Sequence, residues 1–362
     1  MSRNKRLMKR RVTYIVILIV LITTVSTTKG YAQDPHFSQF YANPLYLSPS
    51  LAGATDGGRI TLNYRNQWPA ISKAFSTYAV SVDNFFPAFN SGLGFYLMQD
   101  QAGSAGLKST NAAFQYSYNL ILTEKWQIVP AIQFEYGNRA IDFSKLIFAD
   151  EEIGGGSSGS WDRLENEQVN YMDLAASVFA YSPKYWVGLT VNHLAKPNYT
   201  FLGEEMKYDL KYTLFGGINI WRERQRTSTV ERSFSFSFRL QHQKKFNQAD
   251  VGVYWHNSPM EIGIWYRGLP LGNENVSINQ DAIVALIAYD LGAFRIGYSY
   301  DITISGLGIQ SAGAHEISII FEFNQNFGLR LKGRRPAVPC SSTANPLSST
   351  KRKYKRKSRK IF

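Results

Sequence analysis

The stretch FRIGYSYDITI, Phe294–Ile304, alternates strictly between two kinds of side chain. Phe, Ile and Tyr fill the even-numbered positions, whereas Arg, Gly, Ser, Asp and Thr fill the odd-numbered ones. Because successive side chains of a β-strand point to opposite faces, this period of two predicts a strand with one apolar and one polar face. The pattern lasts eleven residues, whereas strands of globular proteins are usually about 5–6 residues long.

The same alternation recurs along most of the chain, for example in SFSFSFRLQ at 233–241, NAAFQYSYNL at 111–120 and HEISIIFEF at 315–323. Most repeats span roughly 9–12 residues, which suits a tilted strand that crosses a bilayer. The predicted fold class is therefore all-β, a transmembrane antiparallel β-barrel of 14 strands. The predicted strands are 58–68, 75–85, 91–101, 107–120, 126–141, 170–181, 184–195, 210–221, 233–243, 248–256, 261–269, 281–291, 294–304 and 313–323.

The lengths of the predicted connections support a barrel. If the first strand runs outward from the periplasm, even-to-odd connections face the periplasm and should be the shorter ones. The short connections are 182–183, 257–260 and 292–293, the long ones are 142–169, 196–209, 270–280 and 305–312, and 222–232 is an exception. In this arrangement four large aromatic residues fall at periplasmic strand ends, as in the aromatic girdle of such barrels. These residues are Trp126, Tyr181, Trp186 and Trp221.

The charge of the chain is concentrated at its two ends. The 362 residues carry a net charge of +13, but residues 1–32 hold seven Lys/Arg and residues 328–362 hold twelve, with no acid in either segment. The body between them therefore has 21 basic and 27 acidic residues, a net charge of −6. This balance does not indicate nucleic-acid binding. The single cysteine, Cys340, excludes an internal disulfide.

The N-terminus has the order of a secretory signal peptide. Six basic residues lie within 1–11, an apolar run follows at 12–25, and Gly30 and Ala32 lie at −3 and −1 of a cut before Gln33. The apolar run is shorter than the ~20 residues that a spanning helix needs. We therefore expect residues 1–32 to be a signal peptide, with an uncleaved anchor as the alternative.

The segment QDPHFSQFYANPLYLSPSLAGA, 33–54, is apolar but has neither a helical nor a strand period. Residues before proline are pushed out of the helical region, so Asn43-Pro44 and Ser48-Pro49 should form turns. We expect residues 33–57 to form an ordered plug in the periplasmic mouth or the lumen of a barrel at 58–327. The candidate plug residues are Phe37, Phe40, Tyr41, Asn43, Pro44 and Tyr46.

Little in the sequence points to catalysis or to a cofactor. None of the five histidines pair at i, i+4, and the GGSSG at 155–159 lies in a Gly/Ser-rich loop rather than between a strand and a helix. We expect no enzymatic activity, no cofactor and no metal site. Charged residues on the polar strand faces should instead line the lumen as solvated groups. They are Arg239, Arg295, Asp301, Glu316 and Glu322.

The C-terminus reads KRKYKRKSRKIF after a Pro/Ser/Thr-rich linker. Blocks of like charge are usually disordered interaction arms. We expect residues 328–362 to be a disordered, periplasmic tail that could bind an acidic protein face, anionic lipid or the cell wall. Its candidate partner-binding residues are Lys351, Arg352, Lys353, Lys355, Arg356, Lys357, Arg359 and Lys360.

The segment 33–54, followed by RITLNYRNQWPAI and FSTYAVSVD, resembles the start of the PorP/SprF family. The positions that match the family's opening motif are Asp34, Pro35, Phe37, Ser38, Gln39, Asn43, Pro44, Leu47, Pro49, Ala52 and Gly53. Ser48-Pro49-Ser50 departs from the Asn-Pro-Ala that the family more often shows. The resemblance is specific at 33–68 and consists mostly of strand pattern afterwards; the basic tail has no counterpart in the motif.

This resemblance implies an outer-membrane protein of a Gram-negative bacterium of the Bacteroidetes, associated with type IX secretion and gliding. It implies a non-enzymatic role in helping to export, anchor or couple a surface adhesin or secreted cargo. The expected partners are the outer-membrane lipid bilayer, the periplasmic ring and motor proteins of the system, and the cargo adhesin. Two alternatives remain: an outer-membrane diffusion channel or hydrophobic-solute transporter, and a secreted soluble β protein.

Overall fold

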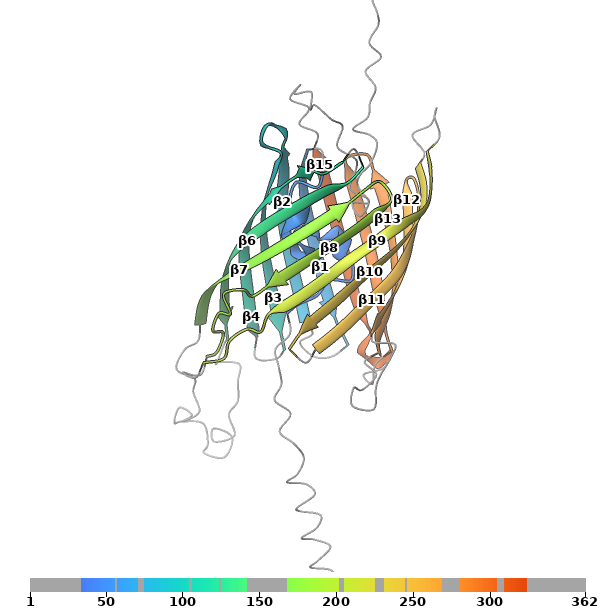
Figure 1. Ribbon diagram of the computed structural model, residues 1–362. Helices are drawn as coiled ribbons and strands as arrows, with labels where there is room; N and C mark the ends of the chain where they lie inside the picture. The colour runs from blue at the N-terminus through green and yellow to red at the C-terminus, as the bar shows by residue number, and fades with distance from the viewer. Residues whose placement is uncertain are drawn as a thin grey trace, which may run out of the picture. The chain divides into compact units, whose positions relative to one another are not determined.

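A computed structural model shows one continuous antiparallel sheet that closes on itself (Figure 1). The structure describes residues 34–55, 57–70, 75–103, 106–123, 125–141, 168–201, 205–224, 231–244, 246–268, 280–304 and 309–323. Each strand pairs with its neighbours in sequence, and β1 (Gly58–Gln67) pairs with β15 (Ala314–Phe323) from Gly58↔Phe323 to Gln67↔Ala314. This last pairing completes the ring, so no edge strand is exposed.

The described residues form fourteen strand positions, because the short β5 continues the line of β4 after a break at Asn119 and both pair with β6. The predicted 14-stranded barrel is therefore confirmed, with boundaries that differ by a few residues. The remaining strands are β2 (Phe75–Phe86), β3 (Ser91–Ala102), β4 (Leu107–Tyr118), β5 (Leu120–Ile121), β6 (Gln127–Ala140), β7 (Gln168–Tyr181), β8 (Tyr185–Asn192), β9 (Lys211–Arg224), β10 (Glu231–Gln243), β11 (Phe246–Asn257), β12 (Met260–Gly268), β13 (Gln280–Leu291) and β14 (Phe294–Thr303).

The two faces of the sheet have opposite chemistry. On β14, Ile296 and Tyr298 are exposed on the outer face, whereas Arg295, Ser299 and Asp301 are buried on the inner face. A lipid-facing apolar band around a polar interior is the pattern of a transmembrane barrel. Among the described residues, no helix is long and apolar enough to cross a membrane.

Inward-facing aromatic rings lie flat over glycines of the neighbouring strand. Trp265 of β12 pairs with Gly252 of β11, and a Cβ on that glycine would lie 2.3 Å from the indole ring. Trp186 of β8 has the same relation to Gly217 of β9. The missing side chain therefore makes room for a large ring against the wall, which keeps the ring inside the barrel.

This packing corrects the prediction of the aromatic girdle. Trp126 and Trp221 are exposed on the outer surface as expected, but Tyr181 and Trp186 are fully buried in the lumen. Tyr181 stacks on Phe179 and donates a hydrogen bond from its hydroxyl to Gln127 at 2.7 Å. The alternation in this part of the chain places both rings on the inner face.

Six connections lie at one end of the barrel, which we call the turn end: β2–β3, β5–β6, β7–β8, β9–β10, β11–β12 and β13–β14. They are the even-to-odd connections when β4 and β5 are counted as one strand. The opposite end is the loop end. The turn end is uppermost in Figure 1, and it is where β1 begins and β15 ends. Predictions for residues 1–32, for the loop 142–167 and for the tail 328–362, including all candidate residues from Lys351 to Lys360, lie outside the described residues.

Candidate functional site in the barrel lumen

Ahead of β1, the chain folds into three short helical turns that occupy the interior of the barrel (Figure 1). They are η1 (Phe40–Ala42), α2 (Pro44–Leu47) and η2 (Pro49–Leu51). Pro44 and Pro49 each lie at the first position of a turn, where proline's fixed φ suits a helix and its missing N–H leaves no donor unpaired. We call residues 36–55 the lumen segment.

All six candidate plug residues lie in this segment, inside the barrel, and they are buried to different degrees. Phe37, Phe40, Asn43 and Pro44 are buried, whereas Tyr41 and Tyr46 are partly buried. The Tyr41 hydroxyl donates to the carbonyl of Gly216 at 3.2 Å and accepts from Trp186 Nε1 at 3.2 Å. Phe40 and Tyr41 thus contact strands on the β8–β12 side of the wall, whereas Tyr46 contacts Tyr96 of β3 on the opposite side.

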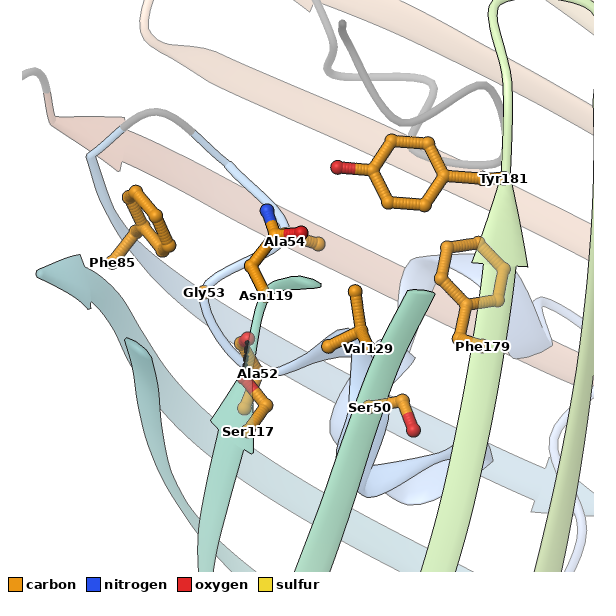
Figure 2. Close-up of a pocket in the computed structure, with 10 residues that line it drawn as sticks. All are labelled: Ser50, Ala52, Gly53, Ala54, Phe85, Ser117, Asn119, Val129, Phe179 and Tyr181. Atoms are coloured by element: carbon orange, nitrogen blue, oxygen red, sulfur yellow. Dashed lines mark hydrogen bonds between the residues drawn. The ribbon is translucent and has the colours of Figure 1, made fainter. Parts of the chain in front are cut away.

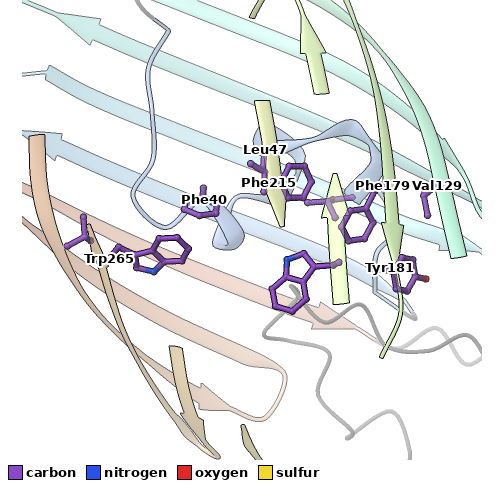
Figure 3. Close-up of a cluster of buried hydrophobic side chains, with 10 residues drawn as sticks. Phe40, Leu47, Val129, Phe179, Tyr181, Phe215 and Trp265 are labelled. Atoms are coloured by element: carbon purple, nitrogen blue, oxygen red, sulfur yellow. The ribbon is translucent and has the colours of Figure 1, made fainter. Parts of the chain in front are cut away.

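Two buried hydrophobic clusters hold the segment against opposite sides of the wall. The first joins Phe40, Leu47 and Leu51 to rings of the β6–β12 wall, including Phe215 and Trp265 (Figure 3). The second joins segment residues to the β2–β4 wall; its members are Phe37, Leu45, Ala52, Ala79, Tyr96, Met98 and Ala113. Since each buried large side chain contributes about 1.5–3 kcal/mol, these contacts favour the docked segment strongly.

Toward the loop end, the backbone of the segment captures a buried carboxylate. The N–H groups of Ser38 and Gln39 donate to the two oxygens of Glu316 at 2.7 and 3.0 Å. The Gln39 side chain donates to the Glu316 carbonyl at 2.9 Å and accepts from Ser318 Oγ at 2.7 Å. These backbone and side-chain hydrogen bonds fix the segment to β15.

The hydroxyl of Ser38 lies at the centre of a buried ion-pair network. It donates to Asp301 Oδ2 at 2.7 Å and accepts from Arg65 at 2.6 Å and from Arg267 at 2.8 Å. Both arginines also pair with Asp301, and Arg65 pairs with Glu316. Charge-assisted hydrogen bonds of this kind are stronger than neutral ones, so one serine links β1, β12, β14 and β15 to the segment.

A third arginine extends the same network. Arg239 pairs with Asp250 at 2.7 Å, donates to the Phe37 carbonyl at 3.3 Å, and has its guanidinium 4.4 Å from the centre of the Phe40 ring. Asp250 in turn pairs with Arg267 at 3.0 Å. The expectation of solvated lumen charges is therefore wrong for Arg239, Asp301 and Glu316, because the lumen segment covers them.

The other two predicted lumen charges lie outside this network. Arg295 pairs with Glu261 at 2.7 Å and with Asp290 at 2.9 Å, on β12–β14 near the turn end. Glu322 is partly buried, near the end of β15. Both lie on the inner side of the wall, as predicted, and Arg295 is buried rather than solvated.

A second anchor holds the segment near the turn end. The Gly53 N–H donates to Asp83 Oδ2 at 2.7 Å, and Asp83 pairs with Arg59 at 2.9 Å. Arg59 also donates to the Leu51 carbonyl at 3.2 Å. Gly53 has φ +65°, and a Cβ there would lie 2.7 Å from the backbone of Gly92, so the close approach requires glycine.

The two anchors lie far apart along the barrel. Ser38 contacts the wall at Arg65 of β1. Gly53 contacts the wall beside Arg59, which lies six residues before Arg65 on the same strand. At about 3.3 Å per residue this is a span of roughly 20 Å along the strand. The segment therefore extends along the inside of the barrel rather than covering one mouth.

A small pocket remains between the segment and the wall at the turn end (Figure 2). It lies beside the break between β4 and β5, where Asn119 is buried. Its lining is mainly apolar and combines the segment with β2, β4, β6 and β7. The lining residues are Ser50, Ala52, Gly53, Ala54, Phe85, Ser117, Asn119, Val129, Phe179 and Tyr181.

His36 is the titratable group of the segment, and its Nε2 is buried without a hydrogen-bond partner. Burial lowers the pKa of this imidazole well below its usual range, and the positive charges of Arg267, Arg65, Arg239 and Lys211 lower it further. The neutral ring therefore belongs to the docked state. In the described part of the chain, no group of three or more His, Cys, Asp or Glu side chains could hold a metal ion.

Sequence reasoning named the aromatic residues of the segment but missed Ser38, Gln39 and Gly53 as anchors. The sequence did contain a signal for these anchors. Inward positions on β1, β14 and β15 carry Arg65, Asp301 and Glu316, and buried charges in a closed barrel require partners. A segment that supplies free N–H groups and a hydroxyl satisfies that need.

Comparison with known proteins gives one family assignment. Residues 29–321 match the family model described as type IX secretion system membrane protein PorP/SprF. No curated protein matches the chain.

Among solved structures, the toluene transporter TodX of P. putida is similar over 77% of this chain and 93% of its own, with 10% identity and a TM-score of 0.46. The CymD monoaromatic hydrocarbon channel covers 78% and 93%, with 12% identity and a TM-score of 0.41. The KdgM porin covers 73% and 99%, with 11% identity and a TM-score of 0.35.

Proposed function

Because the chain belongs to the PorP/SprF family of type IX secretion system membrane proteins, we propose that it is a non-enzymatic outer-membrane accessory of that system. It helps to export, anchor or couple a surface adhesin or secreted cargo, and it works as a docking barrel rather than as an open pore. The observation that carries this proposal is the lumen segment, which is tied to the wall at Ser38 and at Gly53.

The anchoring contacts support a lumen that stays closed. An open diffusion pore needs a hydrated passage, whereas here Arg239, Asp301 and Glu316 are turned from solvent and bonded to the segment. We propose that residues 33–57 act as a resident plug and that cargo or partner proteins bind at the two ends of the barrel. The turn end faces the periplasm in this proposal, since short turns lie on that side of outer-membrane barrels.

The C-terminal tail supplies a second binding element in the proposal. Its last twelve residues contain eight Lys/Arg and follow the final strand, which ends at the turn end. A basic arm there would attract acidic faces of periplasmic ring or motor proteins. The candidate residues remain Lys351–Lys360.

Affinity purification from native outer membranes tests the proposal. The full chain should co-purify with periplasmic secretion components and with a large surface protein, and deletion of 330–362 should weaken the periplasmic set in a salt-sensitive way. Recovery of neither class would refute the accessory role. An unchanged partner set at low salt would refute the role of the tail alone.

Planar-bilayer recording separates this function from the alternative of a diffusion channel or hydrophobic-solute transporter. The full-length barrel should show little steady ion conductance. Stable open-pore conductance, or uptake of a hydrophobic solute into proteoliposomes, would support the alternative instead.

A further inference from the structure

Exposed basic residues gather on one side of the turn end, on three successive hairpins. Lys125 lies before β6, Lys184 lies between β7 and β8, and Arg222 and Arg232 lie on the β9–β10 hairpin. All four side chains are exposed. We call these four residues the basic arc.

Each hairpin of the basic arc pairs its cation with an aromatic residue of the outer girdle. Trp126 follows Lys125, Tyr185 follows Lys184, and Trp221 precedes Arg222. These three rings are 40, 45 and 46% exposed on the lipid-facing surface. The Lys184 amine lies 5.4 Å from the centre of the Tyr185 ring.

The arc is confined to one side of the turn end. The other turns at this end, 87–90, 258–259 and 292–293, contain no charged residue. Across the three arc hairpins, 122–126, 182–185 and 221–232, the sequence holds six Lys/Arg and three Glu. The local excess of positive charge therefore belongs to these hairpins rather than to the whole rim.

Two exposed cations at the opposite end are neutralised by carboxylates. Lys207 pairs with Glu205 at 2.8 Å, and Lys244 pairs with Asp209 at 3.1 Å. Within the described ranges, neither Lys125 nor Lys184 has a carboxylate partner. These amines are available to an external anion.

The position of the arc identifies the kind of anion. Aromatic residues of the girdle lie at the level of lipid headgroups, so the adjacent cations lie where headgroup phosphates lie. We propose that the basic arc binds the phosphates of anionic phospholipids in the leaflet at the turn end. Each Lys or Arg near an anionic surface contributes about 1 kcal/mol, about a fivefold change in affinity.

This lipid contact would act on one side of the barrel only. It would hold the β5–β10 side against the headgroup layer and leave the uncharged turns on the other side free for protein contacts. The inference requires the outer-membrane location but not a role in cargo export.

Lipid retention tests the proposal. The full-length barrel is reconstituted in bilayers of phosphatidylethanolamine with phosphatidylglycerol, extracted, and analysed for bound lipid by native mass spectrometry. Wild-type protein should retain phosphatidylglycerol preferentially. The triple variant Lys125→Gln, Lys184→Gln, Arg222→Gln should retain at least about fivefold less.

The matched control replaces three exposed lysines at the loop end: Lys108→Gln, Lys207→Gln and Lys244→Gln. It should retain phosphatidylglycerol like the wild type. Equal loss in both triple variants, or no loss in the arc variant, would overturn the proposal.

A measurement on unmodified protein guards against misfolding of the variants. Retention by the wild type should fall several-fold when extraction is done at about 500 mM rather than about 50 mM salt, because exposed charges are screened. Salt-independent retention would also contradict the assignment.

Discussion

At the scale of single residues, Glu316 and Ser38 determine how firmly the lumen segment is held. A buried carboxylate without partners is costly, and Glu316 obtains two of its partners from the segment backbone and one from Arg65. Segment and wall therefore stabilise each other. Removal of the segment would leave a charge uncovered, and removal of the charge would leave two N–H groups without an acceptor.

The variant Glu316→Gln should loosen the segment. A neutral amide can accept one of the two backbone N–H groups but loses the charge that strengthens these bonds, so docking should weaken by about 1.5–3 kcal/mol. Limited chymotrypsin digestion should then cut within the segment, at Phe37, Phe40 or Tyr41, faster than in the wild type.

Glu205→Gln provides the control, because Glu205 pairs with Lys207 on the exposed surface. Its digestion should match the wild type. Equal cleavage of Glu316→Gln and wild type would show that the Glu316 contacts do not hold the segment.

The docking of the segment should also depend on pH through His36. Its docked pKa lies below that of a solvated imidazole, so the released state binds more protons as pH falls below about 6.5, and docking weakens toward acid. The charges that act on His36 are those of Arg267, Arg65, Arg239 and Lys211. The three arginines are themselves paired with Asp250, Asp301 and Glu316.

Protease sensitivity of the segment should rise between pH 7.5 and pH 5 in the wild type. The variant His36→Gln should remove most of that rise, because glutamine does not titrate. A rise of the same size in both proteins would assign the pH dependence to another group.

The inner charges themselves were predictable from sequence, since Arg239, Asp301 and Glu316 occupy the polar positions of alternating strands. The residues of the lumen segment that pair with these charges were not predictable from the sequence. Alternation specifies the face of a sheet on which a side chain lies, but it contains no information on what fills the space in front of that face. The contacts of Ser38 with Glu316, Asp301 and Arg267 join residues more than 200 positions apart.

At the scale of elements, glycine and aromatic residues form cross-strand pairs that make room for large rings on the inner wall. Gly252↔Trp265, Gly263↔Tyr254 and Gly188↔Phe215 are direct partners in the ladder. In each pair the ring lies over the glycine, where a Cβ would come within 2.7 Å of it. The rings can then pack against Phe40 and Tyr41 without crowding them.

The variant Gly252→Ala should destabilise the barrel by about 1–3 kcal/mol. Its Cβ would lie 2.3 Å from Trp265, so the indole must shift toward Phe40 and overpack the cluster. Heat-modifiability on SDS gels, which follows unfolding of the barrel, should show a lower transition temperature.

The control for this variant is Ala249→Val on the same strand, whose side chain is on the outer face of β11. It adds volume toward lipid rather than toward the cluster, and its transition should stay close to that of the wild type. A similar drop in both variants would point to strand propensity instead of ring packing.

All fourteen strands were predictable because each has a period of two over a bilayer-spanning length. The short turns of the lumen segment were not, although Asn43-Pro44 and Ser48-Pro49 marked where they begin. The girdle prediction failed for Tyr181 and Trp186 because an aromatic residue near a strand end is compatible with either face. Which face it takes depends on its phase in the alternation of its own strand, and Trp186 lies between the outward-facing Tyr185 and Val187.

At the scale of the whole molecule, the closed wall and the lumen segment form one unit in which the segment covers the charges of the inner wall. The inner wall holds three arginines and three acids in one network, Arg65, Arg239, Arg267, Asp250, Asp301 and Glu316. Without the segment these groups would face water, and the barrel would have a polar passage.

Deletion of residues 36–50 should therefore convert a closed barrel into a conducting one. The deletion removes the loop-end anchor and the segment residues Phe37, Phe40, Leu45 and Leu47 of the two hydrophobic clusters. The strand pairing that closes the ring, including β1 with β15, remains. Planar-bilayer recordings should show steady ion conductance at least tenfold above that of the full-length barrel.

The point variant Ser50→Ala is a suitable control, since it removes one hydroxyl contact with Ser177 but leaves both anchors in place. It should remain closed. If the deletion variant forms a heat-modifiable barrel yet conducts no more than the wild type, then side chains of the wall close the lumen by themselves. The segment would then stabilise the barrel rather than close it. Only the binding of partner proteins would then support a docking barrel.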